Sequence, residues 1–166
     1  MEIPGGHQTK PAVFLYEFLG TAGLLISVNL GCEMMSTKMT AEAVSMTVFA
    51  LIAIFGAACG AHYNPAVSTA VYIREAKFAE HFGLYLMILL AEMLGGAAGV
   101  MIVTLSVVRG GTLPEETKIN LLCPTRAPWD PSPSLCDGRG YFLQSFLMET
   151  FVTFVFCAVV LAVKYD

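Results

Sequence analysis

The sequence predicts an all-α protein that crosses a membrane several times. Hydrophobic residues make up 56% of the 166 residues and charged residues only 13%, whereas a soluble domain typically carries about 25% charge. The mean hydropathy is +0.68. Four apolar stretches reach or nearly reach the roughly 20 residues that a helix needs to cross the hydrocarbon core. They are Val13–Leu30, Ala43–Ala61, Phe82–Val108 and Tyr141–Val163. We therefore expect an integral, multi-pass membrane protein in contact with the lipid bilayer, in a membrane that the sequence does not specify.

The first predicted span follows a short N-terminal tail, residues 1–12. This tail contains one lysine and lacks the layout of a signal peptide, so we expect Val13–Leu30 to be retained as a span. The polar stretch Cys32–Glu42 is expected to connect it to the second span.

The second span is followed by an interruption, GAHYNPAVSTAVYI, at Gly60–Ile73. Asn64 is a good N-cap residue, and Pro65 is tolerated in a first helical turn because its missing N–H would have no partner there. The Asn-Pro pair therefore predicts a helix start. The predicted helix, residues 65–73, has about two to three turns and is too short to span the membrane.

Irregular backbone at membrane depth is tolerated only where it is buried in protein or lines a watery cavity. The carbonyl groups of Gly60, Ala61, His62 and Tyr63 would then form a ladder of acceptors facing such a cavity. Asn64 adds an amide donor at the positive end of the short helix. Together these groups would bind passing neutral molecules and repel cations. The pattern favours a pore, and the alternative is an ordinary re-entrant turn or a cap at the membrane surface.

The rest of the chain is expected to contain two further spans separated by a loop. The third span, Phe82–Val108, is longer than necessary and therefore predicts a tilted helix. The amphipathic stretch Arg74–His81 before it is expected at the membrane interface. Residues 109–140 are rich in proline and predict an extramembrane loop. Cys123 and Cys136 in this loop could form a disulfide if the loop faces an oxidising space, a point that the sequence leaves open.

A weak internal repeat links the first and fourth spans. FLYEFLGT at Phe14–Thr21 and FLMETFVT at Phe146–Thr153 share the pattern F-L-x-E-x-x-x-T. Internal similarity of this kind marks the repeats of many transport proteins. We interpret residues 13–108 as a first repeat with three transmembrane helices and the half-helix, and residues 141–166 as the first helix of a truncated second repeat.

These residues resemble the aquaporin and aquaglyceroporin family of major intrinsic proteins. The stretch Gly60–Ser68 is similar to the first Asn-Pro-Ala loop of that family, Glu17–Thr21 to its first-helix signature, and Glu149 to its second such glutamate. The resemblance implies six tilted helices and two half-helices that meet in mid-membrane, in tetrameric channels for water, glycerol or other small neutral solutes. The predicted fold is thus an aquaporin-like helical bundle, incomplete, with about four transmembrane helices and one half-helix.

The resemblance also implies roles for individual residues. Asn64, Pro65 and Ala66 would form the tip of the first half-helix, and Gly60, Ala61 and His62 the carbonyl ladder. Glu17 and Glu149 would be buried acceptors that hold the re-entrant loops. We favour these roles over a proton relay through the buried carboxyls, and we favour a neutral, hydrogen-bonding His62 over one that gates by protonation.

The sequence departs from the family pattern in several places. It contains no second Asn-Pro-Ala stretch, no arginine after one, and no fifth and sixth helices, so solute selectivity is left open. Val44, twenty residues before Asn64, falls where an aromatic residue would narrow the pore, which implies a wider or less polar constriction. Glu92 falls where the family commonly has glutamine, and a carboxyl there must be paired, protonated or functionally special.

Three interpretations of this incomplete channel remain open at this stage. The chain is part of a longer channel, or it is one half of a split channel completed by another chain or an antiparallel copy, or it is a channel-derived, non-conducting structural subunit of a larger membrane complex. We prefer a channel or channel half, with a homo-tetramer, a complementary half or other subunits as partners. The sequence shows no pattern typical of an enzyme, a metal site or a cofactor site, and no basic run that would indicate a nucleic-acid partner.

Overall fold

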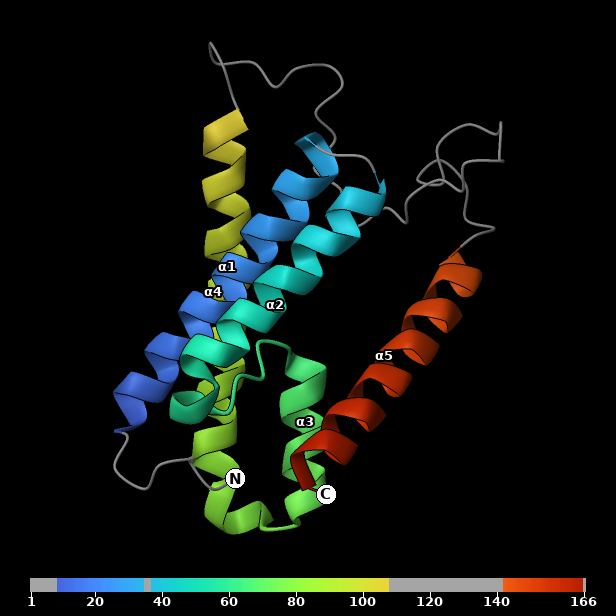
Figure 1. Cartoon of the computed structure of the whole chain (residues 1–166). Coiled ribbons are helices and arrows are strands. Elements are labelled where there is room, and N and C mark those ends of the chain that lie inside the picture. The colour runs from blue at the N-terminus through green and yellow to red at the C-terminus, as the bar shows by residue number, and fades with distance from the viewer. Residues whose placement is uncertain (1–8, 35–36, 108–141, 166) are drawn as a thin grey trace. The chain divides into compact units, whose positions relative to one another are not determined.

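The computed structural model describes residues 9–34, 37–107 and 142–165. Within these ranges the chain forms helices and no strand (Figure 1). The helices are α1 (Lys10–Met34), α2 (Thr37–Cys59), α3 (Pro65–Glu75), α4 (Phe78–Val107) and α5 (Phe142–Tyr165).

All of these helices except α3 are long and apolar enough to cross a membrane. Their candidate spans are Lys10–Leu30, Ala41–Cys59, Phe78–Ser106 and Phe146–Tyr165. The predicted all-α membrane fold, with four spans and one short helix between the second and the third, is confirmed.

The first two helices are longer than the predicted spans. α1 begins at Lys10 rather than Val13 because Pro11 needs no N–H partner in a first turn, and the Thr9 carbonyl accepts the N–H groups of Ala12 (2.9 Å) and Val13 (3.2 Å). The polar connection predicted at Cys32–Glu42 is wrong, because α1 continues to Met34 and α2 begins at Thr37. A helix satisfies its own backbone hydrogen bonds, so polar side chains alone do not end it.

The helices on either side of the predicted interfacial stretch divide that stretch between them. α3 continues to Glu75 instead of Ile73, and α4 begins at Phe78 instead of Phe82. Ala76, with a left-handed backbone at φ 54°, ends α3 and donates its N–H to the Ile73 carbonyl at 3.2 Å. This is the usual chain reversal at a helix C-terminus, and it turns the chain directly into α4.

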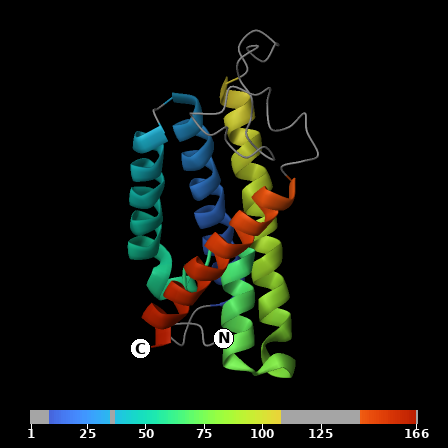
Figure 2. The ribbon, with the colours of Figure 1, turned by 90° about the vertical axis from the view of Figure 1, so that its right-hand side faces the viewer.

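Helices α1 to α4 belong to one compact unit, in which α1 and α4 make the most extensive contact. Figure 2 shows α1 between α2 and α4, with α3 beside the first half of α4. A Cβ atom added to Gly95 would overlap the Phe18 carbonyl oxygen, and one added to Gly99 would lie 2.6 Å from the Ala22 oxygen. Small residues on α4 thus bring the two backbones into close contact, as they often do between membrane helices.

Helix α5 belongs to the second unit. Its candidate span contains no buried residue, and its large apolar side chains are exposed, including Phe151, Phe154 and Val163. A surface of this kind suits contact with lipid. The predicted loop at 109–140, with Cys123 and Cys136, lies outside the described residues.

Candidate functional site

The loop between α2 and α3, Gly60–Asn64, has an unusual backbone. Gly60 has φ 90°, and the non-glycine residues Ala61 and Tyr63 have φ 50° and 51°. A left-handed backbone costs a non-glycine residue roughly 1–2 kcal/mol. Two such residues in one short loop require surrounding contacts that hold them, and strained backbone of this kind concentrates at functional sites.

Glu17 on α1 provides the first of these contacts. It is 0% exposed. Its Oε1 accepts the His62 N–H at 3.1 Å, and its Oε2 accepts the Tyr63 N–H at 2.9 Å. Consecutive N–H groups that converge on one anion form a backbone nest, so this carboxyl and the loop conformation stabilise each other.

Glu92 on α4 holds the loop from a second helix. It is 1% exposed, and its Oε1 accepts both the Asn64 N–H at 3.1 Å and the Ser68 hydroxyl at 2.7 Å. Its Oε2 is buried and has no hydrogen-bond partner among the described residues. The sequence predicts loop-supporting carboxyls at Glu17 and Glu149. It leaves the role of Glu92 open, and in the structure Glu92 contacts both the loop and the first turn of α3.

Asn64 caps α3 at its N-terminus. Its extended backbone (φ −152°, ψ 121°) precedes Pro65 in the first turn, and its Oδ1 accepts the Ala66 N–H at 2.9 Å. Its carbonyl accepts the Ser68 N–H at 3.0 Å, the first bond of the helix. Because Oδ1 is the acceptor here, Nδ2 is the donor end of the amide. Asn64 is half-buried, Pro65 is exposed and Ala66 is half-buried.

The carbonyl oxygens of the loop point away from the two carboxyls. The described chain contains no cis peptide bond, and the N–H and C=O of a trans peptide unit point in opposite directions. Because the N–H groups of His62 and Tyr63 point at Glu17, the carbonyls of Ala61 and His62 face the other way. By the same reasoning the Tyr63 carbonyl faces away from Glu92.

His62 joins the same network through its side chain. Its Nδ1 lies 3.0 Å from the Ser68 Oγ, and the ring is 5% exposed. Ser68 has a single hydroxyl hydrogen, which it donates to Glu92. Nδ1 must therefore be the donor to Ser68, which assigns the proton-bearing ring nitrogen from the hydrogen-bond network.

Tyr63 anchors the loop to α1 and α2. Its hydroxyl donates to the Leu51 carbonyl at 3.1 Å, and its ring occupies the space that a Cβ on Gly20 would need. The Ala61 N–H donates to the Cys59 sulfur at 3.3 Å. The only atom at position 20 that leaves room for the tyrosine ring is a hydrogen, so this glycine is required by packing.

Sequence reasoning did not single out Ser68, Gly20 or a packing role for Tyr63. For Ser68 a signal exists, because it lies one turn after Asn64 and therefore on the same face of the short helix. For Gly20 and Tyr63 the sequence contains no signal, because their contact joins residues that are far apart in the chain.

The two remaining residues of the predicted site are Val44 and Glu149. Val44 is half-buried on α2, and Glu149 is exposed on α5, which belongs to the other unit. The roles that the sequence suggests for them stay predictions.

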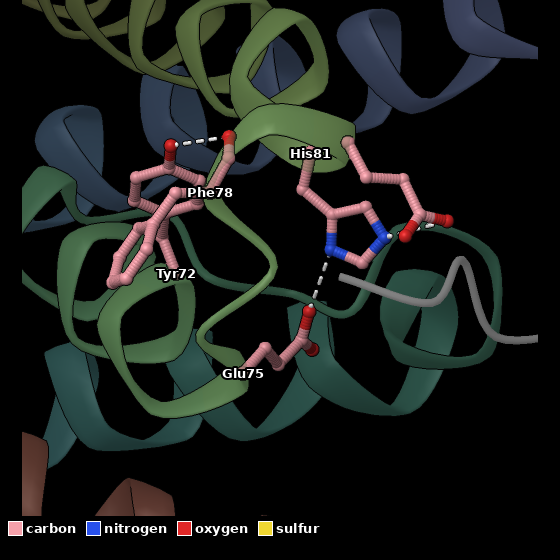
Figure 3. Close-up of polar contacts among 5 residues, drawn as sticks. Tyr72, Glu75, Phe78 and His81 are labelled. Carbon is pink, nitrogen blue, oxygen red and sulfur yellow. Dashed lines mark hydrogen bonds and ion pairs between the residues drawn. The ribbon is translucent and has the colours of Figure 1, made fainter.

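Aromatic and polar contacts join the C-terminal end of α3 to the start of α4 (Figure 3). The Tyr72 ring stacks on Tyr85 with centroids 4.2 Å apart and meets Phe78 edge-on at 5.3 Å. The Tyr72 hydroxyl donates to the Phe78 carbonyl at 2.8 Å, and the His81 Nδ1 lies 3.1 Å from the Glu75 Oε2. In the described part of the chain, no group of three or more His, Cys, Asp or Glu residues could hold a metal ion.

Comparison with known proteins identifies the family of the chain. The family model described as major intrinsic protein matches residues 10–166. The chain belongs to the major intrinsic protein family. A curated relative, an aquaglyceroporin of Toxoplasma gondii, is 37% identical over 59 residues, which cover 36% of this chain and 22% of that protein. No solved structure matches. The resemblance stated from the motif and its flanks is thereby confirmed, and with it an integral membrane protein.

Proposed function

We propose that the chain forms a channel, or one half of a channel, for the passive permeation of water or small neutral solutes such as glycerol. The observation that carries the proposal is the direction of the loop peptides. The carbonyls of Ala61, His62 and Tyr63 face away from the protein groups that bind the matching N–H groups. They form a row of acceptors that ends at Asn64.

Such a row can replace part of the hydration of a passing molecule. Carbonyl acceptors followed by an amide donor suit a molecule that both donates and accepts hydrogen bonds, as water and glycerol do. The N-terminal end of α3 carries a partial positive charge, and Asn64 lies at that end. A cation would meet repulsion there, so neutral solutes are favoured.

The hydrogen bonds of the loop hold its backbone in one conformation, which suits a segment that lines a pore. Three successive N–H groups of the loop bind to carboxyls on two different helices, Glu17 on α1 and Glu92 on α4. Without these contacts the peptide units of the loop are free to rotate, and the common direction of the carbonyls is lost. Membership of the major intrinsic protein family, and the name of the aquaglyceroporin relative, favour transport over an enzymatic role.

A pore of this kind needs a second half-helix opposite the first. We propose that it comes from a complementary half, from a second copy, or from further residues of a longer protein, and that the completed channels associate as homo-tetramers. Exposed apolar side chains on α2, among them Met46, Phe49 and Ile54, provide a surface for lipid or for such neighbours. Val44 on the same helix is our candidate for a constriction residue.

Osmotic shrinkage of vesicles tests the proposal. Vesicles that contain the chain in its intact assembly should shrink faster in hyperosmotic sucrose than empty vesicles. Asn64→Trp should slow that shrinkage, because it removes the cap and places a large ring at the end of the carbonyl row. The matched control is Phe154→Trp, which introduces the same ring at an exposed position of α5 and should leave the rate unchanged.

The same measurement identifies the competing hypothesis. If wild-type, Asn64→Trp and empty vesicles all shrink at one rate, the chain is a non-conducting structural subunit of a larger membrane complex. If the rates rise for the wild type but both tryptophan variants match it, the pore does not pass Asn64.

A further inference from the structure

The buried Oε2 of Glu92 is an unusual feature of the loop network. Its sister oxygen, Oε1, accepts two hydrogen bonds, whereas Oε2 is buried and accepts none among the described residues. Glu17 also accepts two backbone N–H groups, but they bind one to each of its oxygens. The two carboxyls hold successive N–H groups of the same loop, since Glu17 binds those of His62 and Tyr63 and Glu92 binds that of Asn64.

The two forms of a carboxyl group fit this arrangement differently. A carboxylate spreads its charge over both oxygens, so an ionised Glu92 would leave half of a buried charge without a donor, which is costly. A neutral acid has one carbonyl oxygen, which accepts hydrogen bonds, and one hydroxyl oxygen, which carries the proton. The observed pattern, with two donors on Oε1 and no partner on Oε2, favours the neutral acid, because an unpaired buried hydroxyl costs less free energy than an unpaired buried charge.

The groups around Glu92 also favour its neutral form. Glu17 faces it from α1 as a second acid, and two negative charges at one site disfavour each other. Ser68 on α3 is neutral, and Tyr63 and Cys59 contribute a phenol and a thiol near the loop. His62 touches Ser68. Glu92 itself makes no ion pair among the described residues.

We propose that Glu92 is a proton-binding site at the N-terminal end of α3, with the proton on Oε2 at neutral pH and the loop seated only while the proton is bound. Loss of the proton to water converts the acid into a carboxylate and creates a second anion beside Glu17. The repulsion between the two carboxylates then opposes the hydrogen bonds on Oε1, and the loop is held less firmly against α4. In consequence, the permeability of the pore falls as pH rises, a part of the inference that rests on the proposed function.

A cationic His62 with an anionic Glu92 would have the same net charge as the neutral pair. That arrangement buries two charges separated by the Ser68 hydroxyl, with exposed fractions of only 5% and 1% for the two residues. Separated buried charges repay their desolvation poorly, so the neutral pair is favoured. The two arrangements differ in whether a protonated carboxylic acid is present.

Infrared spectroscopy of the full chain in lipid vesicles tests the proton directly. At neutral pH the wild-type spectrum should contain the C=O stretch of a protonated acid that is absent from Glu92→Gln and that disappears at alkaline pH. Glu42→Gln, at an exposed position of α2, is the control and should retain the band. If Glu92→Gln loses a carboxylate band and no acid band, the proposal is wrong.

A second variant covers the case in which Glu92→Gln does not fold. Ser68→Ala leaves Glu92 in place and removes one of the two donors to Oε1, so it should shift the acid C=O stretch to a higher frequency. An unchanged band would show that the acid is elsewhere and would overturn the proposal.

Permeability then tests the consequence. Wild-type vesicles should lose shrinkage rate between neutral and alkaline pH, whereas Glu92→Gln, which keeps an acceptor and a donor at every pH, should not. Equal pH profiles would refute the link between proton and pore. If no vesicle shrinks faster than empty ones at any pH, the channel proposal fails, but the infrared result still decides the proton site.

Discussion

The two ends of α3 are held in different ways. At the N-terminal end, buried contacts come from α1 and α4, and they join residues 45, 46, 28 and 24 positions apart. At the C-terminal end, the contacts of Tyr72 with Phe78 and of Glu75 with His81 join residues only six positions apart.

The difference shows which end depends on the rest of the bundle. The C-terminal turn can form wherever α3 meets α4, because its parts lie in one short segment. The N-terminal end exists only when α1 and α4 are already packed and present Glu17 and Glu92 to the loop. The half-helix is thus anchored locally at one end and positioned by the tertiary structure at the other.

The largest effect is expected at Glu17. Glu17→Ala would leave the His62 and Tyr63 N–H groups buried without an acceptor, at about 1–3 kcal/mol each, so the free energy of unfolding should fall by roughly 2–6 kcal/mol. Circular dichroism during denaturation in mixed micelles would measure the loss. Glu17→Gln, which retains one acceptor oxygen, should lose less. A loss no greater than that of Glu80→Ala, at an exposed position, would show that the loop does not depend on α1.

A medium effect is expected from the contact that positions both glutamates. Gly95→Ala would place a Cβ on the Phe18 carbonyl and should cost about 1–3 kcal/mol of unfolding free energy, as overpacking usually does. Gly96→Ala is the matched control. A Cβ there meets nothing within 4 Å, and it should stabilise the helix by roughly 0.5–1 kcal/mol.

Hydrogen exchange can show which end of α3 is destabilised by Gly95→Ala. The N–H groups of the loop should exchange faster in this variant, whereas those of the turn around Ala76 should keep the wild-type rate. Equal acceleration at both ends would contradict the proposed independence of the C-terminal turn.

The smallest effect, opposite in sign, is expected at the C-terminal end. Ala76 has a left-handed backbone and an exposed side chain, so Ala76→Gly removes strain and should raise the unfolding free energy by about 1 kcal/mol. The vesicle shrinkage rate should stay at the wild-type value. A slower rate would show that the turn also influences the N-terminal end.

Much of the fold could be predicted from the sequence because its signals are local. Apolar stretches of membrane length predicted the four spans, and the Asn64-Pro65 pair predicted where α3 begins. The helix ends were less predictable. Polar residues in Cys32–Glu42 did not stop α1 or α2, because a polar side chain costs nothing where a helix leaves the hydrocarbon core.

The site was only partly predictable, because only some of its contacts join residues that are close in sequence. A local signal singled out Asn64, and the family resemblance singled out Glu17. The contacts of Glu92 with the loop and of Gly20 with Tyr63 join helices that are distant in sequence. Single residues there carry no signature, since a buried glutamate and a glycine each have many possible roles.

By itself the sequence determined the membrane class, the number of spans and the start of a short capped helix, because each depends on the hydrophobicity or hydrogen bonding of neighbouring residues. Only the tertiary structure decided which carboxyls hold the loop and where its carbonyls point. A peptide unit turns its oxygen away from whatever binds its N–H, and the acceptors that bind those N–H groups come from α1 and α4.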